Sequence, residues 1–79
     1  MNAYTNEYAQ KIYSILAPMV GDLMSKSIIK SNTARLGIKE DSIQLSNLPI
    51  LAAEMKKGLI VFLGSGAAET VALRIANIH

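Results

Sequence analysis

The sequence predicts an all-α fold, a small bundle of three to four helices that begins with a long helix. Apolar residues in the first third recur at steps of three and four, the spacing of one helix face. Only residues 43–45 and 59–63 could form strands, and an isolated pair of strands is marginal in water. Because 51% of the residues are hydrophobic and 18% charged, a disordered chain is excluded. All 79 residues are assigned to a single helical domain, 1–79.

The first helix is expected within residues 3–36. Its apolar stripe includes Tyr8, Ile12, Leu16, Met19, Val20, Leu23, Met24 and Ile28. Pro18 lies inside the pattern, where it removes a backbone donor and crowds the preceding turn, so it either kinks the helix or divides it in two. Gly37 supplies a left-handed stop after Leu36.

A connection follows, with Ile43 and Leu45 as buried anchors and one helical turn after Lys39. Asn47 is expected to cap a middle helix with its side-chain oxygen, and Pro49 suits the first turn of that helix.

Gly58 leaves two alternatives for the apolar run that follows it. If Gly58 ends the helix, residues 59–63 form a strand. If it is tolerated, at about 1 kcal/mol, the helix continues to residue 63. We favour the helix because a strand would lack partners. Residues 64–66 then form a turn, and a last helix begins near Ala67.

The residue inventory argues against an enzyme. The chain has no cysteine, which removes thiolate nucleophiles and cysteine-based metal sites. Its one histidine, His79, is the final residue, where side chains are seldom held in place. The six carboxylates are scattered along the sequence. We therefore expect no catalytic, metal-binding or cofactor-binding residues.

One segment resembles a cofactor motif. Residues 59–76 resemble the opening of flavin- and nicotinamide-binding Rossmann domains, with Gly64 and Gly66 at the first two glycines of the fingerprint. Glu69 stands where the third glycine belongs, and its carboxylate would lie beside the diphosphate. The resemblance therefore implies no dinucleotide site.

The chain is expected to act in the cytoplasm, without a membrane. The first ten residues are polar and lack the charged opening and apolar core of a secretory signal. The charge-free stretch at residues 58–68 is shorter than the roughly 20 residues that a membrane helix needs.

Small size and high apolar content predict a homo-oligomer, with a dimer favoured. A chain of this length buries only about 60–65% of its unfolded surface, so a second copy would complete the core. An unidentified protein partner is also considered. The function expected first is a non-enzymatic, self-associating interaction module. Its candidate interface follows the first helix: Tyr8, Ile12, Leu16, Ala17, Val20, Gly21, Leu23 and Met24.

Two other functions are considered. A nucleic-acid-binding protein would use the basic residues Lys26, Lys30, Arg35 and Lys39, which have no acid between them and would have to face the same way. A weaker hypothesis is an apolar ligand site lined by flexible side chains, namely Met19, Met24, Met55 and Phe62.

Overall fold

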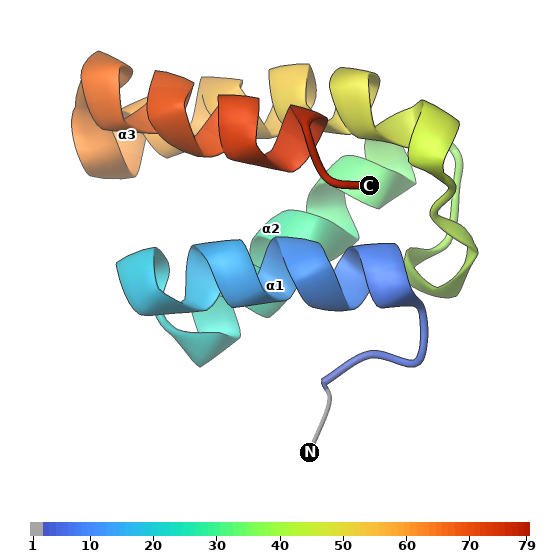
Figure 1. Cartoon of the computed structure of the whole chain (residues 1–79). Helices are drawn as coiled ribbons and strands as arrows, with labels where there is room; N and C mark the ends of the chain where they lie inside the picture. The colour runs from blue at the N-terminus through green and yellow to red at the C-terminus, as the bar shows by residue number, and fades with distance from the viewer. Residues whose placement is uncertain (1–2) are drawn as a thin grey trace.

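The protein consists of two helical hairpins, which we call pairs (Figure 1). A computed structural model describes residues 3–79, and the first two residues of the polar N-terminal segment lie outside this part. The helices are α1 (Glu7–Val20), α2 (Asp22–Arg35) and α3 (Leu48–Ala76), and two short 3-10 turns, η1 (Glu40–Ser42) and η2 (Leu45–Asn47), connect the pairs. Helices α1 and α2 form the first pair, and the two arms of the bent helix α3 form the second. Residues 3–79 contain no strand, which confirms the all-α prediction and the helical interpretation of residues 59–63.

A single glycine forms the corner of each pair. Gly21 separates α1 from α2 with φ 89° and ψ 171°, and Gly64 interrupts α3 with nearly the same geometry, φ 82° and ψ 164°. This region of backbone conformation is open essentially to glycine alone. α3 therefore consists of an N-terminal arm, residues 48–63, and a C-terminal arm, residues 65–76, and the ion pair between Lys56 and Glu69 joins the two arms.

The expected break at Pro18 is wrong by three residues. α1 continues through Pro18 to Val20, and the chain turns at Gly21 instead. Proline removes one helical hydrogen bond but keeps a helical φ, whereas the corner needs a positive φ that glycine adopts at little cost. The start of the last helix is also corrected, because the C-terminal arm begins directly after Gly64 rather than near Ala67.

Hydrogen bonds to α1 and to the end of α2 hold the connection between the pairs in place. The Asn6 side chain caps α1 by accepting from the Ala9 N–H at 2.9 Å, and its Nδ2 donates to the Ile43 carbonyl at 3.0 Å. At the end of α2, Gly37 adopts φ 71° and the Ile38 N–H donates to the Thr33 carbonyl, so the left-handed stop is confirmed.

Two expectations for the connection are wrong. The Asn47 side chain does not cap α3, because its Oδ1 accepts from the Gln44 N–H in the preceding turn. Of the two expected anchors, Ile43 is buried but Leu45 is half exposed. The turn after Lys39 is present as η1.

The core closes within one chain. All three helices and the connection contribute to one apolar cluster: Ala9, Ile12, Leu16, Ile28, Ile29, Ile43, Leu48, Leu51, Ala52, Met55, Leu59, Ala68, Val71, Ala72 and Ile75. The accessible surface of the described residues is 4661 Å². A compact monomer of 8.5 kDa is expected to expose about 4650 Å². Small size alone therefore does not require a second copy to close this core.

The two helix pairs repeat one structural plan. A shift of 43 residues places Gly64 on Gly21 and aligns the buried positions of the pairs. The matching buried positions are Ala9 and Ala52, Ile12 and Met55, Leu16 and Leu59, Ser25 and Ala68, Ile28 and Val71, Ile29 and Ala72, and Asn32 and Ile75. Few of these residues are identical, so the sequence shows no repeat.

The pairs pack face to face with both glycine corners at the same end of the molecule, on the left of Figure 1. α1 lies beside the C-terminal arm of α3, and Lys11 donates a hydrogen bond to the His79 carbonyl at 2.8 Å. α2 lies beside the N-terminal arm of α3 and runs in the opposite direction.

Candidate interaction surface

Large apolar side chains remain exposed after folding, and most of them belong to α3. The exposed set is Met19, Leu23, Leu45, Ile50, Ile60, Val61, Phe62 and Leu73. The most apolar window of the segment Leu45–Ala76 is only 28% buried. Single exposed apolar residues are common on monomers, whereas a contiguous exposed apolar patch is typical of a contact site.

By length and composition alone, the segment Leu45–Ala76 could cross a membrane. In the structure, however, Gly64 turns the chain back within this segment. Its longer straight arm, residues 48–63, would extend only about 24 Å. A bilayer core is about 30 Å thick, so the fold does not present the segment as one straight span.

A groove lies between α2 and the N-terminal arm of α3. We call it the α2/α3 groove, and it has a volume of about 270 Å³. Its lining combines apolar, small and polar residues: Met24, Ser27, Ile28, Ser31, Asn32, Arg35, Met55, Gly58 and Phe62. Three of the four residues predicted for an apolar ligand site, Met24, Met55 and Phe62, are therefore brought together, and Met19 is not.

Gly58 lines the groove without contributing a side chain. A Cβ atom added there would meet no atom within 4 Å. The 43-residue shift pairs Gly58 with Ile15, whose side chain packs against the core. Glycine inside a helix costs about 1 kcal/mol relative to alanine. Gly58 thus weakens the helix locally and leaves a hollow where the other pair has a side chain.

The groove also holds the least satisfied polar group of the described chain. Asn32 is 7% exposed, and its Nδ2 donates to the Ile28 carbonyl at 2.7 Å. Its Oδ1 is buried without a hydrogen-bond partner. Such a group costs about 1–3 kcal/mol of stability. The matching position in the other pair is Ile75, which is apolar and fully buried.

Three of the four basic residues line two adjoining hollows, and the fourth lines the α2/α3 groove. Lys30 and Lys39 line a larger hollow of about 550 Å³ beside α2, together with the acids Glu40 and Asp41. Lys26 lies near Lys30 in an adjoining hollow. Arg35 lines the α2/α3 groove instead. The positive charges are thus divided between grooves and partly offset by carboxylates.

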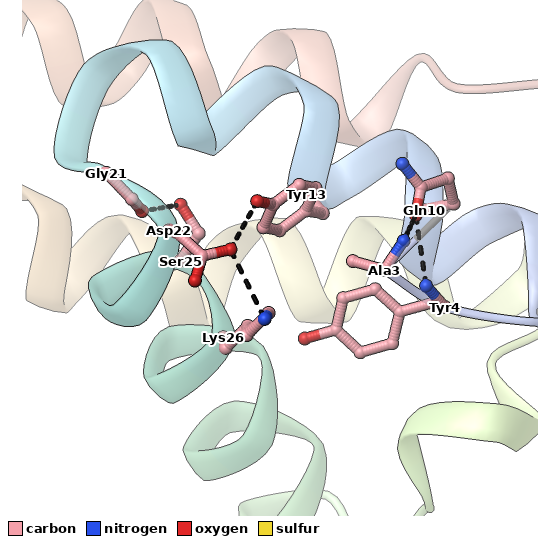
Figure 2. A network of polar contacts seen from close by, with 8 residues as sticks. All are labelled: Ala3, Tyr4, Gln10, Tyr13, Gly21, Asp22, Ser25 and Lys26. Carbon is pink, nitrogen blue, oxygen red and sulfur yellow. Dashed lines mark hydrogen bonds and ion pairs between the residues drawn. The ribbon is translucent and has the colours of Figure 1, made fainter. Parts of the chain in front are cut away.

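Lys26 also belongs to a polar network at the corner of the first pair (Figure 2). Tyr13 Oη donates to Asp22 Oδ1 at 2.5 Å, and Lys26 Nζ lies 3.3 Å from the same oxygen. The hydrogen bond from Tyr13, with the added effect of Lys26, holds the pKa of Asp22 below its usual value. The same hydrogen bond raises the pKa of Tyr13. The network ties α1 to α2 at the surface.

Replacing Tyr13 by phenylalanine is expected to raise the pKa of Asp22 toward its ordinary value of 3.8, because the carboxylate loses its strongest partner. The ionised carboxylate stabilises the fold above that value, and this contribution is lost as the pH falls through the lower pKa of the folded state. The variant should therefore lose less stability on acidification. An NMR titration of the Asp22 carboxyl carbon measures the shift.

Tyr8→Phe is the matched control, since it removes a tyrosine hydroxyl from the same helix without touching Asp22. An unchanged Asp22 titration in Tyr13→Phe would contradict the hydrogen bond.

The candidate interface on the first helix has mostly become core. Ile12 and Leu16 are fully buried within the chain, so this fold leaves them no surface for a second copy. The side chains of Tyr8, Val20 and Met24 are partly buried against the same core, and Ala17 is half-buried. Gly21 forms the corner, and only Leu23 is a large apolar residue that is mostly exposed.

The residues that sequence reasoning missed are Gly58, Asn32 and Val61. A glycine four residues before Phe62 inside an apolar helix was the available signal for the groove. Asn32 could not be recognised, because its missing partner depends on the packing of α2.

Within residues 3–79, no group of three His, Cys, Asp or Glu side chains is arranged to hold a metal ion. No model of a known protein family matches the chain, and no curated protein or solved structure matches it. Proposals about function therefore depend on the surface itself.

Proposed function

We propose that this protein is a non-enzymatic interaction module that binds a second copy of itself through the α2/α3 groove and the apolar side chains beside it. The observation that carries the proposal is the exposure of Phe62, 55%, which lines an open groove, while the preceding residue Val61 is 80% exposed. Burying apolar surface gains about 25 cal/mol per Å², so this patch favours association. Aromatic residues such as Phe62 are enriched in the centres of interfaces.

In this proposal, the helical segments form a small bundle whose exposed apolar face is covered on dimerisation. The apolar stripe of the first helix supplies the core. The proposed contact between copies is therefore at the α2/α3 groove instead of on the first helix. The protein would act in the cytoplasm, and the dimer would present the remaining apolar residues, such as Ile50, to a further protein.

Nucleic-acid binding through Lys26, Lys30, Arg35 and Lys39 remains the alternative and has less support. Contacts to phosphates need several cations on one surface. Lys26 is paired with Asp22, and Arg35 lies in a different groove from Lys39.

The solution mass measured by light scattering tests the proposed function. The wild-type mass is expected to rise from that of a monomer to that of a dimer with concentration, equally at low and high salt, because the contact is apolar. The double variant Val61→Ser/Phe62→Ser should remain monomeric with unchanged helix content.

Leu73→Ser is the matched control, because Leu73 is as exposed as Phe62, at 54%, but does not line the groove. A wild-type protein that is monomeric at all concentrations would refute self-association. Equal dissociation by Leu73→Ser would place the contact elsewhere.

A further inference from the structure

Most of the exposed apolar side chains gather at one end of the molecule. Five of the eight large apolar residues that folding leaves exposed lie within four residues of a glycine corner. They are Met19 and Leu23 beside Gly21, and Ile60, Val61 and Phe62 beside Gly64. Because both corners lie at the left of Figure 1, these side chains belong to one end of the molecule, which we call the corner end.

The corner end forms a thin apolar layer. Residues 58–68, which include the second corner, carry no charged side chain, and residues 17–25 around the first corner carry only Asp22. Four residues of helix extend about 6 Å. The layer is therefore about as deep as the roughly 5–10 Å to which apolar helix faces enter the boundary between lipid headgroups and acyl chains.

Asp22 is drawn back from this layer by its partners. Its carboxylate accepts a hydrogen bond from Tyr13 Oη and lies 3.3 Å from Lys26 Nζ. Figure 2 shows the carboxylate pointing away from Gly21, toward these two side chains. The one acidic group beside the first corner is thus held toward the body of the molecule.

The net positive charge of the protein lies just behind the apolar layer. The charged side chains within nine residues of a corner are Lys26, Lys30, Lys56 and Lys57, with Asp22 and Glu69. The other basic and acidic side chains are equal in number, so the formal net charge of +2 belongs to the half of the molecule that carries the corners. The cytoplasmic leaflet of a membrane has a negative surface potential, which attracts such a surface.

The corner end suits lipid better than a shaped protein partner. None of Met19, Ile60 and Val61 lines any of the three hollows described above. Protein partners are held mainly by side chains packed in pockets, whereas the acyl boundary of a bilayer needs only apolar area. By composition, the segment Leu45–Ala76, which contains the second corner, could lie in lipid.

We propose that the corner end inserts into the headgroup boundary of an anionic lipid bilayer, with Leu23 and Val61 in the apolar layer and the lysines behind them near the lipid phosphates. The protein would lie on the membrane surface without crossing it, so the length that a spanning helix needs does not apply. This inference does not depend on self-association. Val61 serves both proposed surfaces, so a copy bound to lipid would not use it in a dimer.

Flotation with vesicles tests the inference. The wild type is expected to float with vesicles of equal parts phosphatidylcholine and phosphatidylserine, and to bind pure phosphatidylcholine more weakly. Leu23→Ser/Val61→Ser should lower the affinity for the mixed vesicles more than about tenfold, as for the loss of buried apolar side chains. Both residues are 80% exposed, so the helix content should not change.

Leu45→Ser/Ile50→Ser is the matched control. It also removes two exposed apolar side chains, 49% and 57% exposed, but at the opposite end of the molecule (Figure 1). This variant should bind the mixed vesicles as the wild type does.

Tryptophan fluorescence separates insertion from adsorption by charge alone. The chain has no tryptophan, so Val61→Trp supplies a single probe at the corner end and Ile50→Trp a single probe at the other end. With the mixed vesicles, the emission of Val61→Trp should move to shorter wavelength and be quenched by brominated acyl chains. The emission of Ile50→Trp should not change.

Three results would overturn the inference: a wild type that does not float with the mixed vesicles, equal loss of binding in the two double variants, or binding without the emission change of Val61→Trp. Leu23→Ser alone separates lipid binding from self-association, because Leu23 does not line the α2/α3 groove. It should weaken vesicle binding and leave the dimer dissociation constant unchanged. A wild type that floats but never dimerises refutes self-association alone, and one that dimerises but never floats refutes insertion alone.

Discussion

Leu16→Ala should lower the free energy of unfolding by about 2–5 kcal/mol, since it removes a fully buried side chain and leaves a cavity. Globular domains have a total stability of about 5–15 kcal/mol, and one this small lies toward the lower end. The variant is therefore expected to be largely unfolded in mild denaturant. Urea unfolding followed by circular dichroism measures the change.

Met19→Ala is the control for this variant, because Met19 lies three residues further along α1 and is 45% exposed. Its effect should stay within about 0.5 kcal/mol of the wild type, as for ordinary surface substitutions. If Leu16→Ala left stability intact but weakened association, Leu16 would be an interface residue rather than part of the core.

Gly64→Ala is expected to destabilise the protein by about 1–3 kcal/mol, because its backbone conformation is nearly closed to residues with a Cβ atom. The sign of the effect is informative. If α3 were one straight helix, the same substitution would stabilise it by about 1 kcal/mol. Thermal unfolding of the variant distinguishes the two.

Gly66→Ala provides the opposite case within the same helix. Gly66 has no positive φ, and an added Cβ atom there meets nothing within 4 Å. This variant should be as stable as the wild type or more so, by up to about 1 kcal/mol. Stabilisation by both alanines would contradict the corner at Gly64.

Much of the fold could be predicted because its signals are local. Helical spacing, the left-handed stop at Gly37 and the lack of strand partners for residues 59–63 depend on neighbouring residues. The sequence predicts a kink or a division at Pro18 rather than a corner at Gly21, because it shows where a helix is weakened but not where the chain reverses. Gly64 lay within the predicted turn, since a cluster of glycines allows positive φ.

The contact surface was harder to predict. An apolar stripe shows that a helix is covered, but not whether its own chain or another copy covers it. Ile12 and Leu16 therefore fit both readings until their burial is known. The groove beside Gly58 depends on how α2 packs against the N-terminal arm of α3. No local sequence pattern predicts the distance between these two helices.

The most direct test of the account is an NMR dilution series of the wild-type protein, with amide shifts followed from the dimeric to the monomeric state. We predict that the changes cluster around the α2/α3 groove, including Ser31, Gly58 and Phe62, while the buried face of α1 at Ile12 stays constant. Shift changes centred on α1 and absent from the groove would contradict the account.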